Sequence, residues 1–357
     1  MFLSMISKKP ALSGGTAWLN SDSLSFGSLK GKVVLVDFWT YSCVNCLRTL
    51  PYIRMWHEKY AKGGLVVVGV HSPEFEFEKK LENVKEAVEG LGIKYPVVLD
   101  SKYKIFKSFN NHVWPHKFLF DRKGKLRYEH SGEGNYEEAE KWIRKLLLEG
   151  FMPTRLKVEE VRELNLKIEK IPLEKDHTHR FGAVCYPQTG ELYCGYLRGF
   201  CGNRGGFRKN RSYDYQTGGV YADETDGRGG RIYDEQGIYL QGVWKSQRED
   251  LSHLRESNLF EDYLLILVKG VEVNAVCSSS SKKSLKVEVK FNGEYLTSSM
   301  VGEDVKFAPN GQSYFEVSMP RMYRLVKSKR YFDGRLQLFS NSSDFRIYAF
   351  TFGGCVS

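Results

Sequence analysis

The first half of the chain alternates apolar strand-like runs with helical periodicity. Lys32–Trp39 and Leu65–Val70 are nearly continuous apolar, β-branched runs, as expected of strands that are covered on both faces of a sheet. Between them, Cys46–Ala61 repeats apolar residues at helical spacing and is followed by Gly63-Gly64. This β-α-β unit predicts two parallel strands joined by a right-handed crossover helix.

Shorter elements continue this pattern as far as Gly150. The sequence predicts, in chain order, a helix at Asn83–Leu91, a strand at Pro96–Leu99, a helix at Lys102–Phe109, hairpin strands at Lys117–Phe120 and Leu126–His130, and a helix at Glu137–Leu148. We therefore expect one α/β domain over residues 1–150.

The pattern changes class beyond this domain. Residues 151–180 are rich in Lys and Glu and contain Pro153 and Pro172, which predicts a linker. Residues 181–357 contain short alternating segments separated by Gly, Asn, Asp and Ser, which predicts an all-β, jelly-roll-like sandwich. The clearest of these segments are Ile266–Cys277, Leu285–Phe291, Tyr314–Val317, Leu336–Phe339 and Arg346–Phe352.

Composition and charge exclude several classes of protein. Apolar residues make up 41% of the chain and charged residues 27%, which is typical of a globular protein and not of a disordered one. The net charge of +10 is spread over both halves without a basic tail, so we expect no nucleic-acid partner. The arginines in the glycine-rich segment Gly199–Gly230 could contact an acidic ligand, but a solvated loop is the favoured interpretation.

The hydropathy pattern also bears on the membrane and the compartment. The longest apolar run, Tyr263–Val268, has the length of a strand, so no membrane-spanning helix is expected. The apolar start, Met1–Ile6, is short and precedes Lys8 and Lys9, the reverse of a secretory signal. The sequence as written therefore predicts a cytoplasmic location.

The sharpest chemical feature is the segment Ser42-Cys43-Val44-Asn45-Cys46, which follows a predicted buried strand and opens a helix. A structural zinc site would need a second Cys/His pair, and no other CxxC occurs among the seven cysteines. A helix N-terminus stabilises a thiolate, which favours redox chemistry with Cys43 as the attacking sulfur. Cys46, one turn inside the helix, is then the resolving thiol.

These residues resemble the thioredoxin superfamily over most of residues 14–150. By that resemblance Asp37, six residues before Cys43, accepts a proton from Cys46. The alternative is an ion-paired aspartate at a strand end, although a carboxylate within an apolar run is costly without a use.

The resemblance also implies a cis-proline loop that faces the dithiol. Pro115 is the candidate, and an ordinary trans turn is the alternative. A cis bond would let the backbone of Trp114 pair with an extended substrate segment, with Trp114 and Trp39 beside the sulfur. Tyr41 is assigned to the same substrate-binding group.

Longer segments are similar to TlpA/DipZ-type thiol–disulfide proteins. They include Leu29–Cys46 and Gly69–Phe75 in the first half and Val271–Val276 and Tyr348–Gly353 in the second. The resemblance implies exchange with protein thiols and disulfides, an electron donor that the sequence does not identify, and no cofactor beyond the Cys43–Cys46 pair. In this branch a carboxylate near the dithiol modulates its acidity, and Glu74 is the candidate, with a solvated loop carboxylate as the alternative. His71 is either a proton shuttle or a hydrogen-bonded strand-end histidine.

The second half resembles a carbohydrate-binding module. Trp244 and several tyrosines, including Tyr239, could stack on sugar rings, although most such residues belong to a core. A turn at Thr189-Gly190 would place Cys185 opposite Cys194, which permits a structural disulfide.

Two other functions remain as alternatives. A thiol peroxidase of the thiol-specific antioxidant type shares the fold, but Val36 stands where its signature requires proline. A carbohydrate-binding or scaffold protein with a vestigial dithiol is the other, and the presence of Cys43, Cys46, Asp37 and Pro115 together argues against it.

Overall fold

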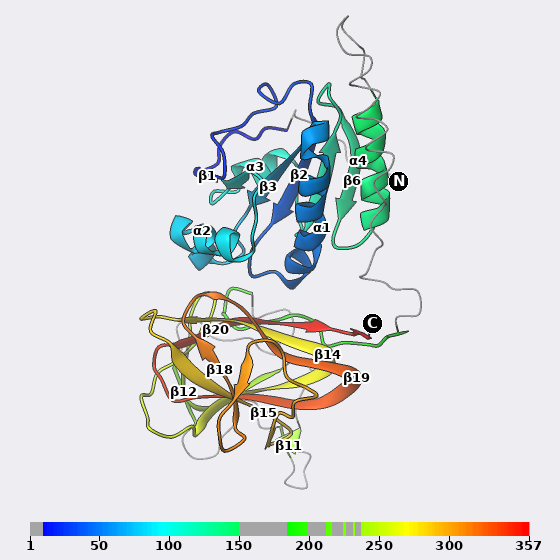
Figure 1. The fold of residues 1–357 in the computed structure, drawn as a ribbon. Coiled ribbons are helices and arrows are strands. Elements are labelled where there is room, and N and C mark those ends of the chain that lie inside the picture. Colours follow the sequence, from blue (N-terminus) through cyan, green and yellow to red (C-terminus); the bar gives the residue numbers. More distant parts are fainter. Residues whose placement is uncertain are drawn as a thin grey trace, which may run out of the picture. The chain divides into compact units, whose positions relative to one another are not determined.

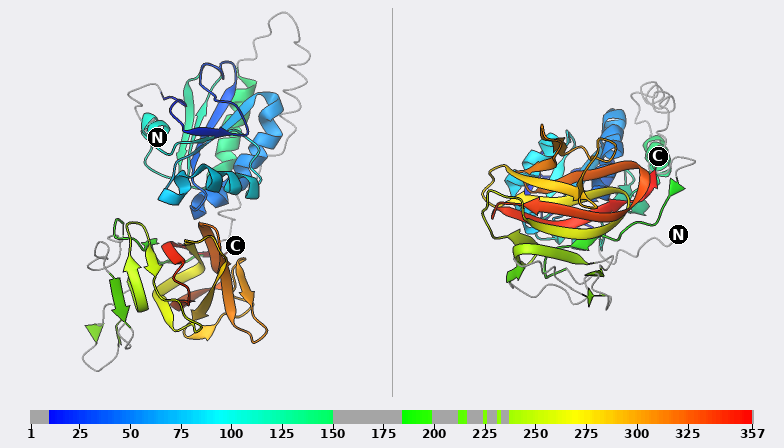
Figure 2. Two further views of the ribbon diagram at one scale, coloured as in Figure 1. Left: turned by 90° about the vertical axis from the view of Figure 1, so that its left-hand side faces the viewer. Right: turned by 90° about the horizontal axis from the view of Figure 1, so that it is seen from below.

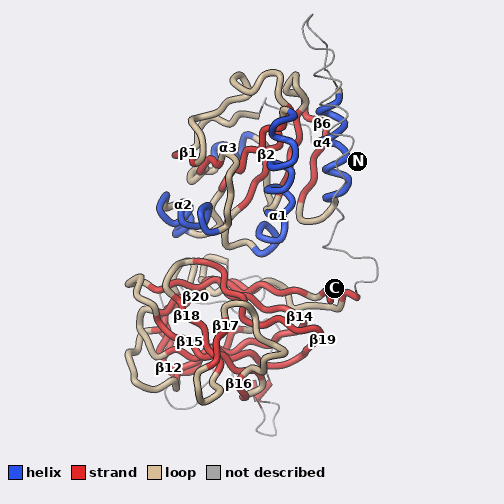
Figure 3. The backbone as a smooth tube through the Cα atoms, viewed as in Figure 1, coloured by secondary structure: helices blue, strands red, loops and turns tan. Residues whose placement is uncertain are grey.

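The computed structural model describes residues 10–149, 184–198, 212–215, 224–225, 231–232 and 237–356. The internal contacts divide the chain into two units, Met1–Arg180 and Phe181–Ser357. The predicted linker at 151–180 lies outside the described residues. All the described helices belong to the first unit, and the described part of the second unit contains strands and loops only (Figure 3).

A six-stranded sheet forms the centre of the first unit, in the order β1-β4-β3-β2-β5-β6 (Figure 1). The strands β2, β3 and β4 are parallel, whereas β1, β5 and β6 join them by antiparallel pairing. The strand bounds are β1 Ala17–Leu19, β2 Val33–Trp39, β3 Leu65–His71, β4 Val97–Leu99, β5 His116–Phe120 and β6 Leu126–Ser131.

Helices cover both faces of this sheet. The helix α1 packs beside α4, since Trp56 and Tyr60 of α1 both donate hydrogen bonds to the buried Glu140 of α4. On the other face, Phe106 and Phe109 pack against Phe38 of β2. The helix bounds are α1 Val44–Tyr60, α2 Leu81–Gly90, α3 Lys104–Ser108 and α4 Tyr136–Leu148, with short 3-10 helices η1 Ala61–Gly63 and η2 Glu76–Lys79. The predicted α/β fold is confirmed, whereas the strand β1 and the short helices η1 and η2 were not predicted.

Two long strands organise the second unit, β14 Asp262–Ser279 and β19 Arg321–Ser340. They pair with each other along almost their whole length, as the yellow and orange ribbons of Figure 2 show. The first half of β14 also pairs with β12 Ile238–Ser246, and its second half with β20 Phe345–Gly353. The strand β14 therefore changes partner along its length on the side that faces away from β19, and β14, β12, β13 (Leu251–His253) and β20 pair in a closed ring within one large sheet.

The remaining strands complete the all-β unit that the sequence predicts. Those that flank the long pair are β8 Leu192–Tyr193, β9 Ser212–Tyr215, β13 Leu251–His253, β15 Leu285–Phe291, β16 Glu294–Tyr295, β17 Val305–Phe307 and β18 Ser313–Val317. Two separate two-stranded sheets pair β10 Glu224–Thr225 with β11 Arg231–Ile232, and β7 Val184–Cys185 with β21 Cys355–Val356. Alternate residues of the long strands fill a common apolar core, including Leu264, Ile266, Leu336 and Leu338.

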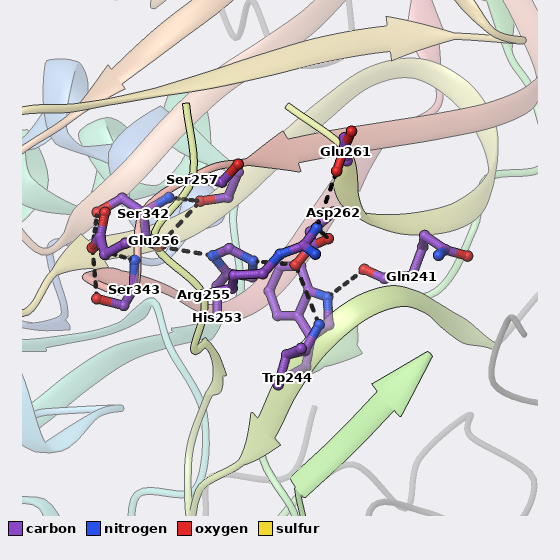
Figure 4. A network of polar contacts seen from close by, with 12 residues as sticks. Gln241, Trp244, His253, Arg255, Glu256, Ser257, Glu261, Asp262, Ser342 and Ser343 are labelled. Atoms are coloured by element: carbon purple, nitrogen blue, oxygen red, sulfur yellow. Dashed lines mark hydrogen bonds and ion pairs between the residues drawn. The ribbon is translucent and has the colours of Figure 1, made fainter. Parts of the chain in front are cut away.

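A polar cluster is buried at the start of β14 (Figure 4). Asp262 is 3% exposed and accepts hydrogen bonds from His253 Nε2 at 2.8 Å, from the backbone N–H of Val243 at 3.3 Å and from the Arg255 guanidinium. The other ring nitrogen of His253 lies 2.9 Å from the carbonyl oxygen of Ser342. These contacts pair the buried carboxylate with cationic and neutral donors, as a buried charge requires.

Gly242 makes room for this cluster. Its φ of +90° lies in the left-handed region, and a Cβ there would approach Asp262 Cγ to 2.0 Å. Glycine is therefore required at position 242, because any other residue would have a strained backbone and a Cβ that clashes with Asp262.

The predicted disulfide between Cys185 and Cys194 is wrong. Cys185 bonds to Cys355, whereas Cys194 is a fully buried free thiol. The two cysteines do not face each other because β7, which carries Cys185, pairs with β21, whereas β8, which precedes Cys194, pairs with β20. The segment around Thr189 is thus a connection between two sheets and not a hairpin turn.

Candidate active site

The two cysteines of the CxxC segment occupy unequal positions at the start of α1. Cys43 is the N-cap residue and is partly exposed, whereas Cys46 lies in the first turn and is 1% exposed. Both are free thiols. The first turn of a helix presents N–H groups without intrahelical partners, which favours a thiolate at its tip. Of the two sulfurs, that of Cys43 is the one that a substrate can approach.

Cys46 is poorly suited to ionise without help. Burial raises the pKa of the Cys46 thiol well above its ordinary value, and the hydrogen bond and charge of Cys43 raise it further. A hydrogen bond with the backbone of Thr40 acts in the opposite direction. A base near Cys46 is therefore needed before this thiol can act as a nucleophile.

Asp37 is the candidate for that base. It lies on β2, is 1% exposed, and interacts electrostatically with the Cys46 sulfur. Burial raises the pKa of Asp37 to about 7, and its Oδ1 has no hydrogen-bond partner among the described residues. A carboxyl group with this pKa can exchange a proton near neutral pH.

Lys117, which sequence reasoning missed, faces Asp37 from the next strand. The two residues are paired in the antiparallel register of β2 and β5, and the charge of Lys117 lowers the pKa of Asp37 against the larger effect of burial. Lys117 is fully buried, and its Nζ donates to the carbonyl oxygen of Gly132 at 3.0 Å. The sequence did hold a signal, because a lysine in the apolar segment that opens β5 needs a buried partner.

The peptide bond between Trp114 and Pro115 is cis, in the loop before β5. Pro115 is buried, and its carbonyl oxygen accepts a hydrogen bond from the N–H of Gly132 at 2.8 Å. Trp114 is partly exposed and packs on Phe106 at a ring distance of 5.0 Å, while Val113 is 41% exposed. The loop therefore combines a fixed backbone with a small apolar surface.

Trp39 and Tyr41, which were predicted to contact substrate, are buried. Trp39 is fully buried edge-to-face against His71, so the prediction that it contacts substrate is wrong: as the last residue of β2 it is enclosed by the core. Tyr41 is 5% exposed and stacks on His71. Burial lowers the pKa of His71 to about 3, so that this histidine is a neutral structural residue and not a proton shuttle at neutral pH.

The buried carboxylate next to the dithiol loop is Glu78 and not Glu74. Glu78 is fully buried, and its Oε1 accepts a hydrogen bond from the Thr40 hydroxyl at 2.5 Å and two from Ser42, from the hydroxyl at 2.7 Å and from the N–H at 3.2 Å. Its Oε2 accepts the N–H of Glu74 at 2.5 Å and that of Phe75 at 3.0 Å. Burial raises the pKa of Glu78 to about 7. Glu78 therefore joins the segment before Cys43 to the insert after β3, whereas Glu74 is partly exposed.

Trp244 and Tyr239, two of the residues considered for sugar stacking, are buried, whereas the side chains of Tyr213, Tyr215, Tyr221 and Tyr233 lie outside the described ones. Trp244 is fully buried, with its indole N–H donating to the carbonyl oxygen of Gln241 at 2.8 Å, and Tyr239 is 2% exposed. The arginines of the Gly199–Gly230 segment lie outside the residues whose side chains are described. Within the described ranges, no helix has the length and apolar character that crossing a membrane requires.

Comparisons with known proteins place this site in a family. The Redoxin family model matches residues 7–146, and the model described as "Thioredoxin like C-terminal domain" matches residues 189–353. The thiol-disulfide oxidoreductase YkuV of Bacillus subtilis is 31% identical over 140 residues, which cover 39% of this chain and 94% of YkuV. The chain belongs to the thioredoxin superfamily, in its TlpA/DipZ-like branch.

Two further similarities each cover 39% of this chain. Protein DipZ of Mycobacterium tuberculosis is 44% identical over 141 residues, which are 39% of this chain and 20% of DipZ. This chain therefore matches about a fifth of the length of that relative. A solution structure of a thioredoxin-like protein in the oxidized form is 31% identical, with a TM-score of 0.37 over 39% of this chain and 94% of that one.

Proposed function

We propose that the chain is a thiol–disulfide oxidoreductase that exchanges disulfides with protein substrates through Cys43 and Cys46. The observation that carries this proposal is the asymmetry of the pair, with an accessible sulfur at a helix tip and a buried one beside Asp37. A scaffold protein would have no use for a buried aspartate with a pKa of about 7 at this place. YkuV, which the first unit matches over most of its length, is named a thiol-disulfide oxidoreductase.

The reaction in the reducing direction has two steps. The Cys43 thiolate attacks one sulfur of a substrate disulfide, which forms a mixed disulfide and releases the other substrate sulfur as a thiolate. Asp37 then accepts the proton of Cys46, whose thiolate attacks Cys43 and releases the second substrate thiol. Lys117 favours the ionised form of Asp37, so that the carboxylate is ready to take this proton.

The cis-proline loop positions the substrate in this proposal. An extended segment pairs with the backbone of Trp114, while the exposed side chain of Val113 supplies apolar contact. The dithiol carries both electrons, so no separate cofactor is required. A protein dithiol or disulfide serves as the second partner and sets the direction of flow.

Trapping of the mixed disulfide tests this proposal. Cys46→Ser keeps the attacking thiolate and removes the sulfur that resolves it, so substrates should remain attached to Cys43. Cys43→Ser is the matched control and should trap little. The adducts are separated by non-reducing electrophoresis of protein recovered from its host and identified by mass spectrometry.

Equal trapping by both variants, or by neither, would refute the assigned roles. The identity of the adducts also tests the compartment. Adducts dominated by secreted or cell-surface proteins would overturn the cytoplasmic prediction and leave the chemistry intact.

A further inference from the structure

Cys185 and Cys355, which form a disulfide, are more exposed than the other described cysteines. Both half-cystines are exposed, whereas Cys194 and Cys277 are fully buried free thiols in the core of the second unit. Disulfide exchange requires that a thiolate reaches a sulfur, and access is one of the factors that set its rate. This disulfide meets that requirement.

Little of the second unit depends on the strands that carry the disulfide. Each of β7 and β21 has two residues, and they pair with each other in a sheet separate from the large one. Among the described residues, the N–H of Tyr186 continues this pairing with the carbonyl oxygen of Gly354 at 2.9 Å. Opening the disulfide therefore leaves the pairing of β14 with β19 and β20 untouched.

The surroundings of the disulfide resemble a bound substrate more than a core. Cys185 lies in an extended strand and is followed by Tyr186, which is 41% exposed and packs against Tyr331 at a ring distance of 5.0 Å. An extended segment with an apolar side chain next to an exposed sulfur suits the backbone pairing and apolar contact that the Val113–Pro115 loop offers.

We propose that the Cys185–Cys355 disulfide is a second redox centre of this protein. It is a substrate for the Cys43–Cys46 dithiol of this same protein. The Cys43 thiolate attacks one sulfur of the Cys185–Cys355 bond, and the other sulfur leaves as a thiolate and takes a proton. Cys46 then displaces the attached sulfur from Cys43, after giving its own proton to Asp37. Two electrons pass to the second unit, which gains two thiols, and the Cys43–Cys46 pair becomes a disulfide. This inference rests on the proposed function.

Transfer between two full-length variants tests the proposal. The donor is the reduced Cys185→Ser/Cys355→Ser variant, freed of reductant, and the acceptor is the oxidised, isotope-labelled Cys43→Ser/Cys46→Ser variant. Both variants also carry Cys201→Ser, which removes the remaining cysteine of the chain from the thiol count. After acid quenching, alkylation with N-ethylmaleimide and peptide mass spectrometry report which cysteines have become thiols.

We expect Cys185 and Cys355 of the acceptor to become thiols that N-ethylmaleimide alkylates. Alkylation of Cys43 and Cys46 in the donor should fall by an equal amount. The transfer should be at least about tenfold faster than reduction by glutathione at the same thiol concentration, because the donor binds the segment as well as attacking it. A donor with Cys46→Ser should become linked through Cys43 to the acceptor.

The other outcomes overturn the inference in distinguishable ways. A donor that reduces insulin but leaves Cys185 and Cys355 unlabelled refutes the second redox centre and keeps the proposed function. A donor that reduces neither refutes both. Cys194 and Cys277 are thiols throughout, so their reaction with N-ethylmaleimide added to the native acceptor before quenching reports unfolding. Transfer accompanied by that reaction would refute exchange at a folded surface.

Discussion

Replacing Asp37 by asparagine should stabilise the first unit, and increasingly so as the pH rises. Burial raises the pKa of Asp37 from 3.8 to about 7, so the folded chain retains a proton that the unfolded chain releases. Stability therefore falls as the pH rises from the lower value to the higher one and is constant above it. A shift of about 3 pKa units corresponds to about 4 kcal/mol in the free energy of unfolding.

The difference between two pH values isolates this effect from the substitution itself. The raised pKa of Asp37 lowers the free energy of unfolding by about 1.7 kcal/mol at pH 5 and by about 4.3 kcal/mol at pH 8. The advantage of Asp37→Asn should therefore grow by about 2.6 kcal/mol between these two pH values. A buried amide without its full set of partners adds a penalty that does not depend on pH and cancels in this comparison.

Hydrogen exchange in increasing urea measures the free energy for the first unit within the full chain. Peptides from β2 and β3 report its opening, and comparing variants at one pH removes the intrinsic dependence of exchange on pH. Asp22→Asn, at an exposed aspartate of the same unit, is the control and should show no such growth. An advantage for Asp37→Asn that is equal at both pH values would refute the elevated pKa and with it the proton transfer assigned to Asp37.

Three further substitutions test neighbouring parts of the argument. Lys117→Met should raise the pKa of Asp37 above about 7, so the pH midpoint for resolving the mixed disulfide in stopped-flow experiments should rise by about one unit; an unchanged midpoint would contradict the pairing. Glu78→Ala should destabilise the first unit by about 3 kcal/mol at pH 5, where the Glu78 carboxyl is protonated in the folded chain. Glu74→Ala should destabilise it by less than about 0.5 kcal/mol. Equal losses would show that Glu78 does not hold the segment before Cys43 to the insert after β3. Gly242→Ala should destabilise the second unit by at least about 2 kcal/mol in urea unfolding, and a neutral result would contradict the close approach described there.

The parts of the fold that sequence reasoning predicted are those with a local signal. The strands β2 and β3 and the helix between them follow from long apolar runs and helical periodicity, and the CxxC position follows from its place between them. The strand β1 was missed because Ala17–Leu19 is short and lacks the β-branched residues that mark the equally short β4, and it exists through its pairing with β4. The local signal therefore gives every strand of this sheet except β1.

The errors at the candidate site arise from contacts between residues distant in the sequence. Lys117 became relevant only when the register of β2 and β5 placed it opposite Asp37. Glu78 and Glu74 belong to the same polar insert, and the turn at η2 decides which carboxylate is buried. The partner of Cys185 depends on strand pairing across a separation of 170 residues, which a count of spacings cannot supply.

The two long strands of the second unit have a consequence for engineering it. Because β14 and β19 pair along almost their whole length and also pair with β12, β20 and β15, a chain break within either long strand would disrupt the pairing of several strands at once. The turn between β14 and β15 is a better place, since residues 281–284 are exposed. Because β7 and β21 already lie side by side, a short peptide can join the native ends of the unit while new ends open at Lys282, giving a circular permutant that retains both long strands.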